Sequence, residues 1–563
     1  MIRNGLLMLV AGTLAVSCAD YNDPNNFPVP YGPGEVNPYA DLGAVKDYIN
    51  RTDNPNLFVS TNITLTEFNN QALEHAAAVT NFDGVAFGYS FMPDKYVSKK
   101  GYMNFMALKD ALGHASTIGT EVYGSPIVAN EQQSDEWFGY LTAPVEVQVL
   151  PIDDKEIDYS TVDEFTGTYE GKKKPSIVKN LDDKGNALEL PTKSKVYIIE
   201  GFDLDPLGYY TVTFTVKTKK EKDETVQCTF ADSLINTGVD KTSGLLIGKK
   251  FPIKPGVWQT VKVECVPSKE ATKGYFKIEG NQNTELYIRN VKVIHTPDNH
   301  RDQTKTEKND TIKYALNKWC NGLMEANAGR IKSFDLIDKP LDSKEEIEEG
   351  ILDLKHSEDK IFWQDYLDEG GKSGSELYGA TVSKVARAAF EKHGGNPAEL
   401  NLYVCETGLE DQKRFNSLMH WIGVWEKNGA VIDGISVVLN LVYSEDATKQ
   451  ADTETKLNTL LENLIKTGRK IRLSNLDIKY EDAEGNPVTS NQITKEQRQK
   501  LADFNADVIK AYMKIPADQK GGICKGNMAD TTSKDPVGLW TRETNSWVRN
   551  ATYEAFCKAL GGK

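Results

Sequence analysis

Residues 331–340 read IKSFDLIDKP, a short apolar run that ends in charged residues and a proline. Further runs of the same kind follow it in the chain, at 400–406, 433–441, 470–478 and 521–528. Runs of this length predict strands, because helices need longer apolar patterns.

Amphipathic patterns predict helices between these strands. A helix over 375–393 is expected to stop at Gly394 and Gly395, because glycine is the preferred residue just past a helix C-terminus. Strands that alternate with helices through the C-terminal half predict parallel β-α units, closed into a (β/α)8 TIM barrel of the α/β class. Two further helices are marked by apolar faces: Ile312, Leu316, Trp319 and Leu323 in one, and Leu501, Phe504, Val508 and Tyr512 in the other.

The middle of the chain breaks this alternation. Within 142–299 we expect strands at 209–218, 259–266, 274–279 and 286–294, separated by turn residues. Such a series of strands without a long helix predicts an all-β sandwich.

The sandwich interrupts the barrel, because strand and helix patterns also precede it. We therefore expect a first barrel part over 39–141, an inserted domain over 142–299, and a second barrel part over 300–563. The polar segment 300–311 is interpreted as the linker that returns to the barrel.

The N-terminus has the pattern of a lipoprotein signal. Arg3 precedes an apolar run at 6–16 that is too short to span a bilayer, and small residues precede Cys18. We expect residues 1–17 to be a signal peptide, with Cys18 lipidated, and 18–38 to be a flexible tether to the membrane. Ordinary secretory cleavage nearby is the alternative.

Acidic residues follow this cysteine closely. Asp20 and Asp23 resemble the surface-export signal of Bacteroidetes lipoproteins. That resemblance implies a protein anchored by its lipid in the outer membrane, at the cell surface.

Charge and cysteine content exclude some functions. The net charge is −15 and the pI about 5.2, so the protein repels phosphate backbones and nucleic acid is not an expected partner. The cysteines form neither a CxxC motif nor a Cys/His cluster, so we expect no metal and no cofactor. Whether Cys228 and Cys265 form a disulfide is not decided by the sequence.

Outside the inserted segment, the sequence resembles glycoside hydrolase family 10, the xylanases. The segments that carry the resemblance stand in the family's order: 331–340, 362–367 (FWQDYL), 400–406, 433–435, 471–478 (IRLSNLDI), and 522–524 with 538–540. The inserted segment resembles a family 4 carbohydrate-binding module. The resemblance implies a barrel whose active site would lie at the C-terminal ends of the strands.

The two positions that match the family's catalytic glutamates hold other residues. Lys339 stands where the family has its general acid, and Asn475 stands where it has its nucleophile. A lysine ammonium is a poor acid for this step, and an amide has no anionic oxygen for attack. The surrounding positions differ too: Asp338 replaces the asparagine before the acid, and the strand-three and strand-six motifs read SPIVAN at 125–130 and VVLN at 437–440.

We therefore expect a glycan-binding protein that does not cleave its ligand, a xylan-like polysaccharide or oligosaccharide. Binding needs aromatic faces and hydrogen-bonding groups, not a pair of carboxylates. Candidate residues at the barrel mouth are Asn130, Lys339, Glu406, Asn440, Asn475 and Trp540, with Trp547 as a further member. The inserted domain offers Tyr197, Tyr209, Tyr210, Tyr275 and Tyr287, while Trp258 is interpreted as a core residue.

Two other functions stay open. An active endo-1,4-β-xylanase, or another glycoside hydrolase, would need Asp338 and Glu406 to replace the missing catalytic carboxylates. A scaffold that contacts an outer-membrane glycan transporter complex would bind no sugar itself. Asp477 matches a position that active members keep, so we expect it to be structural.

Overall fold

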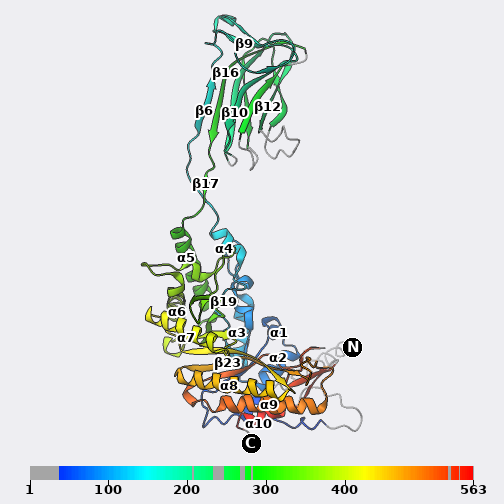
Figure 1. The fold of residues 1–563 in the computed structure, drawn as a ribbon, viewed down its shortest axis with the longest axis vertical. Coiled ribbons are helices and arrows are strands. Elements are labelled where there is room, and N and C mark those ends of the chain that lie inside the picture. The colour runs from blue at the N-terminus through cyan, green and yellow to red at the C-terminus, as the bar shows by residue number, and fades with distance from the viewer. Residues whose placement is uncertain are drawn as a thin grey trace, which may run out of the picture. The chain divides into compact units, whose positions relative to one another are not determined.

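The computed structural model of the protein describes residues 37–561, except 206–207, 233–245, 267–272, 281–282, 531–533 and 544–545 (Figure 1). The chain divides into two compact units. One ends at Thr142 and resumes at Thr304, and the other is Ala143–Gln303. The expected signal peptide and Cys18 lie outside the described residues.

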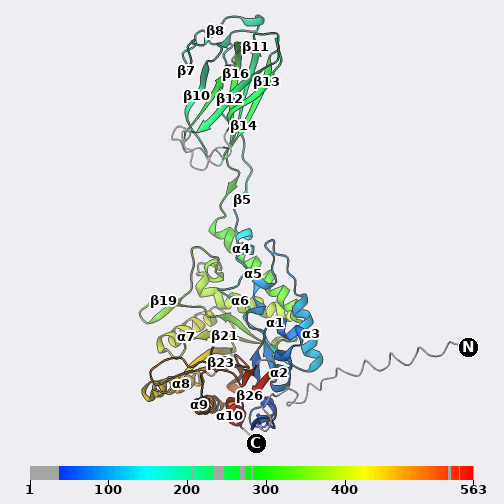
Figure 2. The ribbon, with the colours of Figure 1, turned by 90° about the vertical axis from the view of Figure 1, so that its right-hand side faces the viewer.

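The first unit is built on a parallel sheet with the strand order β3-β2-β1-β24-β23-β22-β21-β18-β4. Helices cover its outer side, as α7, α8 and α9 do beside β21 and β23 (Figure 2). The strands are β1 Val59–Asn62, β2 Gly84–Ala86, β3 Glu121–Tyr123, β4 Val128–Ala129, β18 Ser333–Asp338, β21 Asn401–Thr407, β22 Gly434–Ser444, β23 Lys470–Glu481 and β24 Lys520–Lys525.

The two end strands of this order, β3 and β4, are consecutive in the chain. Between them, Gly124 forms a parallel bridge with Phe334 of β18, and its N–H donates to the Ser333 carbonyl at 2.8 Å. The strands β3 and β4 are thus two pieces of one broken strand, and the sheet closes into a barrel with eight strand positions. The predicted (β/α)8 barrel is confirmed.

Closure leaves no room for a side chain at Gly124. A Cβ there would lie 2.0 Å from Cδ1 of Phe334. We expect Gly124→Ala to lower the free energy of unfolding by about 1–3 kcal/mol, because the Phe334 ring must move. Chemical denaturation measures the loss. Gly113→Ala is the matched control, since a Cβ at that helical position meets nothing within 4 Å. Equal stability of the two variants would contradict the proposed closure.

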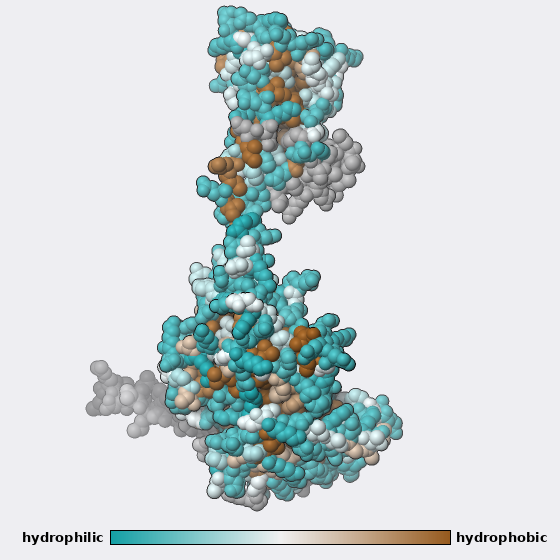
Figure 3. Space-filling view, turned by 60° about the vertical axis from the view of Figure 1, so that its left-hand side comes forward, coloured by the Kyte–Doolittle hydropathy of each residue, from teal (hydrophilic) through white to brown (hydrophobic). Residues whose placement is uncertain are grey.

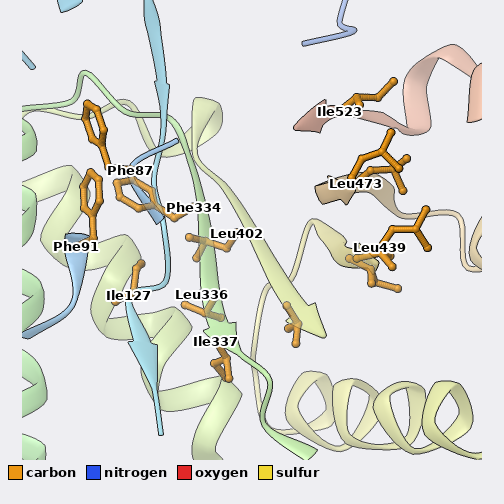
Figure 4. Close-up of a cluster of buried hydrophobic side chains, with 14 of the residues drawn as sticks. Phe87, Phe91, Ile127, Phe334, Leu336, Ile337, Leu402, Leu439, Leu473 and Ile523 are labelled. Atoms are coloured by element: carbon orange, nitrogen blue, oxygen red, sulfur yellow. The ribbon is translucent and has the colours of Figure 1, made fainter. Parts of the chain in front are cut away.

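The helices of this unit bury the faces that their sequence patterns predict. In α5, Ile312, Leu316, Trp319 and Leu323 are all fully buried. Figure 4 shows the strand side of this core, where Phe334, Leu336 and Ile337 lie near Leu402 and Ile127. The helices are α1 Leu65–Asn70, α2 Leu73–Asn81, α3 Met106–Ile118, α4 Asp135–Leu141, α5 Lys305–Asn327, α6 Gly374–Lys392, α7 Gln412–Lys427, α8 Ala447–Lys466, α9 Lys495–Met513 and α10 Ala551–Ala559.

The interpretation of 300–311 as a linker was wrong for most of its length. Helix α5 already begins at Lys305, and Thr304 caps it: its hydroxyl accepts from the Glu307 N–H at 3.2 Å, while the Glu307 carboxylate accepts from the Thr304 N–H at 2.8 Å. This capping box explains why the segment is so polar. The polar residues that predicted a linker are therefore the first turn of helix α5.

The second unit contains two antiparallel sheets. One has the order β13-β12-β15-β10-β7; the other has the order β14-β11-β16-β9-β8, with β6 also paired to β16. Their strands are β6 Ile152–Ile157, β7 Tyr169–Glu170, β8 Ser176–Val178, β9 Ala187–Leu190, β10 Lys195–Asp203, β11 Tyr209–Thr218, β12 Glu224–Asp232, β13 Leu246–Ile253, β14 Gln259–Cys265, β15 Lys273–Glu279 and β16 Leu286–Thr296.

The inner faces of the two sheets share one core. Phe214 of β11 contacts Phe276 of β15, with 6.0 Å between ring centroids, and buried and part-exposed residues alternate along β11. Face-to-face packing of this kind is the expected sandwich. A short ladder of β5 Val145–Glu146 with β17 His300–Arg301 joins the two ends of the unit.

One expectation for the second unit needs correction, and one question that the sequence left open is answered. Trp258 does not lie in the core: its ring is part-exposed, stacks on the Arg289 guanidinium at 4.2 Å, and donates from Nε1 to Asp182 at 3.1 Å. Cys228 is buried with a free thiol, so it forms no disulfide.

Hydrophilic residues predominate on the visible face of each unit (Figure 3). Within the described ranges, no helix is long and apolar enough to cross a membrane.

Candidate functional site

A pocket of about 400 Å³ opens at the C-terminal end of the barrel strands. The residues that line it lie on β1, β2, β3, β18, β21, β22 and β23 and on the segments that follow β2, β3 and β18. We call it the mouth pocket. An adjoining pocket of about 500 Å³ shares Asn62, Gly88 and Tyr89 with it. This end of a (β/α)8 barrel is where its active sites are built.

One wall of the mouth pocket carries Lys339, Asp338 and Tyr89. The Lys339 ammonium donates to the Tyr89 hydroxyl at 2.6 Å, and that hydroxyl donates to the Asp338 carboxylate at 2.5 Å. Lys339 Nζ also lies 3.4 Å from Asp338 Oδ2. Lys339 has a left-handed backbone, with φ of 45°, held by its N–H bond to the Cys405 carbonyl at 2.8 Å.

This arrangement fixes the protonation of the wall. Burial lowers the pKa of Lys339, but Asp338 and the Tyr89 hydroxyl more than offset it and hold that pKa above its ordinary value. Burial and the Asp338 carboxylate raise the pKa of Tyr89. Lys339 therefore stays an ammonium and Tyr89 stays a neutral hydroxyl at neutral pH. The wall offers hydrogen-bond donors and does not release protons.

The facing strands carry a row of amides. The Asn62 amide donates to Asn475 Oδ1 at 3.1 Å, and the Asn475 amide donates to Asn440 Oδ1 at 3.0 Å. Asn440 is exposed at the end of the row. Gly526 makes room for it, because a Cβ there would lie 2.4 Å from Asn475 Oδ1. The row orients each amide, so it presents fixed donors and acceptors to a ligand.

The floor of the mouth pocket is a charged cluster that sequence reasoning missed. Arg472 is fully buried; its guanidinium lies 3.6 Å from the Tyr123 ring centroid and donates to the Ser60 hydroxyl at 3.1 Å. The Tyr123 hydroxyl donates to Asp335 at 2.8 Å. Burial raises the pKa of Asp335 to about 6, although Arg472 and Tyr123 oppose the rise. The signal was present in the sequence, as charged residues inside otherwise apolar strands.

Glu406 does not belong to this site. It is fully buried, and its carboxylate accepts from Arg414 at 3.0 Å and from the N–H groups of Thr407 and Leu341 at 2.8 and 3.2 Å. Side chains alternate along a strand, so while Cys405 lines the mouth pocket, Glu406 points to the outside of the barrel. The prediction that Glu406 lies at the end of a strand is confirmed, but the prediction that its side chain faces the barrel mouth was wrong.

Trp540 is also a core residue and not a sugar platform. It is 1% exposed and packs on Tyr553 and Trp547, with ring centroids 5.0 and 6.1 Å away. Trp547 is buried too, but it lines the adjoining pocket beneath Arg542, whose guanidinium lies 5.1 Å from its ring centroid.

The remaining candidates lie apart from the mouth pocket. Asn130 is buried, and among the described residues neither of its amide atoms has a hydrogen-bond partner. Asp477 forms a buried ion pair with Lys525 and accepts from the Asn527 amide at 2.6 Å, which fits a structural role.

The tyrosines of the inserted unit divide into two groups. Tyr210 and Tyr287 are buried, and Tyr210 stacks on His295. Tyr197 and Tyr275 are part-exposed neighbours on the five-stranded sheet, with 5.7 Å between ring centroids. Tyr209 is exposed. Tyr197 and Tyr275 are therefore neighbouring part-exposed rings on one sheet of this unit.

Comparison with known proteins agrees with the barrel. Residues 294–555 match the family model of glycosyl hydrolase family 10. Xylanase B from Clostridium stercorarium F9 is similar in structure, with a TM-score of 0.50 and 10% identity over 92% of this chain and 99% of that one. An endo-1,4-β-xylanase from Penicillium canescens has a TM-score of 0.49 and 11% identity over 93% and 98%. No curated protein matches the chain. Identities this low show the fold alone.

Proposed function

We propose that this chain, with its barrel of the glycoside hydrolase family 10 type, binds xylan or a related β-glycan at the mouth pocket without cleaving it. One observation carries the proposal. The carboxylates that line the mouth pocket, Asp335 and Asp338, both stand on β18, and the facing strands present the amides of Asn475, Asn440 and Asn62.

Retaining hydrolysis needs two carboxyl groups about 5–5.5 Å apart, on either side of the scissile bond. Here both carboxylates stand on the same strand, β18, and each is bound already: Asp335 by Tyr123, and Asp338 by Tyr89. At the position that resembles the family's acid, Lys339 keeps its proton; at the position that resembles the nucleophile, Asn475 has only an amide. At these two positions, neither step of the reaction has a carboxyl group to carry it.

The wall that carries Lys339 and the row of amides are suited to binding a sugar. Sugar hydroxyls both donate and accept hydrogen bonds, and the fixed amides and the Lys339 ammonium offer both kinds of group in a pocket of the size that holds small ligands. Because the amides are held by one another, little conformational freedom is lost when a sugar binds.

Titration calorimetry against soluble xylan, arabinoxylan, β-glucan and glucomannan, with a reducing-sugar assay on the same samples, tests the proposal. We expect heat of binding with at least one glycan and no sugar release. Sugar release that disappears in Asp338→Asn would overturn the proposal and establish a rearranged hydrolase. Absence of binding to any glycan would favour the scaffold function.

We further propose that the protein is lipidated at Cys18 and held at the outer-membrane surface, beside a glycan transporter complex. The small residues before Cys18 and the acidic residues after it support this. We expect the native chain to partition into detergent and to incorporate labelled fatty acid, whereas Cys18→Ala stays in the aqueous phase without label. A Cys18→Ala chain that still takes up label would contradict lipidation at this residue.

A further inference from the structure

A larger pocket, of about 840 Å³, lies at the opposite end of the barrel. It is lined at the N-terminal ends of the strands, by Phe58 before β1, Glu121 of β3, Ser333 of β18, Asn401 of β21 and Lys470 of β23. We call it the base pocket. It is separate from the mouth pocket in its opening, although Tyr123 contributes to both.

Positive charge gathers in the base pocket. Six cations line it: Lys46, Arg51, Arg330, Lys332, Lys470 and Lys520. Three carboxylates line the same pocket: Asp83, Glu121 and Asp518. This excess stands out in a protein whose net charge is −15. Elsewhere on the chain acidic residues predominate, so the pocket is a local focus of positive potential.

Within the part of the chain that the structure describes, four of these six cations form no ion pair with a carboxylate. Arg51 pairs with Asp83 at 2.6 Å, and Lys332 pairs with Glu399 outside the pocket. Among the described residues, the others make hydrogen bonds only to neutral oxygens, at 2.6 to 3.4 Å: Lys46 to the Val79 carbonyl, Arg330 to the Asn327 carbonyl, Lys470 to Asn401, and Lys520 to Asn54. Glu121 and Asp518 in the pocket lining, and Asp53 near Lys520, are the carboxylates left to balance them.

Lys520 shows that the pocket is built and is not a chance surface cluster. It is 7% exposed, and burial lowers the pKa of its ammonium, with Asp53 in opposition. A buried ammonium bound to a neutral amide is costly unless an anion compensates it. Lys470 is held in the same way, since the Asn401 side chain that accepts from it also donates to Ser333 Oγ at 3.4 Å. Both ammonium groups are thus positioned before any ligand arrives.

We propose that the base pocket binds a small molecule that carries a phosphate or sulfate group. Such a tetrahedral oxoanion accepts several charge-assisted hydrogen bonds at once, which matches the ammonium and guanidinium donors that line the base pocket. The pocket is large enough for the sugar or other body to which the group is attached. This site is independent of the glycan site at the mouth.

Calorimetric titration of the chain from residue 19 onward, which lacks the proposed lipidation site, with inorganic phosphate, pyrophosphate and sulfate tests the base pocket. We expect saturable binding of at least one of them. Lys470→Met and Arg330→Met, made separately, should each weaken that binding about tenfold, because each removes one charge-assisted hydrogen bond. Pyrophosphate bound more tightly than sulfate would identify a phosphate-bearing ligand, and the reverse order a sulfated one.

The control is Lys392→Met, which removes a lysine that also donates to an asparagine, Asn321 at 2.9 Å, on the outer helices. It should leave anion binding unchanged, and the unfolding midpoints of all three variants confirm that they fold. Failure of all three anions to bind at millimolar concentration overturns the proposal. The proposal is also overturned if Lys470→Met and Arg330→Met both bind the anion as tightly as the native chain.

Discussion

Arg472→Met should lower the free energy of unfolding by about 3–5 kcal/mol at neutral pH, because it leaves a buried carboxylate without its neighbouring positive charge. Arg472 is fully buried among the barrel strands, where its guanidinium stacks on the Tyr123 ring. The Tyr123 hydroxyl in turn donates a hydrogen bond to the Asp335 carboxylate. Methionine keeps much of the volume but none of the charge. Chemical denaturation at pH 7.5 measures the loss.

The pH dependence of this loss gives a sharper test. The pKa of Asp335 is raised to about 6 in the folded protein, above the unfolded value, so the folded state holds the proton more tightly. Its contribution is therefore complete at acidic pH and is lost as the pH rises through about 6. Without Arg472 that pKa rises further. We expect Arg472→Met to regain part of its stability at pH 5, where Asp335 becomes neutral.

Asp335→Asn is the partner substitution. In the Arg472→Met background it removes the unpaired charge, so the double variant should be more stable at pH 7.5 than Arg472→Met alone. A double variant that is no more stable, together with no recovery at pH 5, would show that Arg472 acts through packing and not through its charge.

The barrel was predictable because its strands are regular and its helices amphipathic. The limits of the prediction have local physical causes. The break of the third strand into β3 and β4 at Ser125 and Pro126 was not predicted; proline cannot donate to the ladder. Strand β10 of the inserted unit was missed because bulges near Ile199 and Phe202 break its period of two.

The site was harder to predict than the fold because it depends on side-chain direction. A shift in the pairing of β18 between Asp335 and Ile337 allows Asp335 and Asp338 both to line the mouth pocket. On β21, which keeps regular register there, Glu406 turns outward. Strand ends can be read from sequence, but the face on which each residue lies depends on pairing with neighbouring strands.

Asn475→Ala should weaken glycan binding about tenfold to a hundredfold. Asn475 stands in the middle of the amide row, so its loss removes its own contacts, leaves the Asn62 amide nitrogen without this acceptor and takes away the donor to Asn440 Oδ1. The expected cost combines a lost hydrogen bond with the partners left unpaired, at about 1–3 kcal/mol. Titration calorimetry with the glycan that binds the native chain measures it.

Asn317→Ala is the matched control, because the side-chain amide of this exposed asparagine on α5 donates to the Lys313 carbonyl of its own helix, at 2.9 Å. It should bind glycan as the native chain does. If Asn475→Ala binds equally well, the barrel mouth is not the glycan site, and the next variant is Tyr275→Ala on the inserted unit. If Asn475→Ala loses binding while its unfolding midpoint is unchanged, the amide row recognises the sugar, since an effect on folding would have moved both.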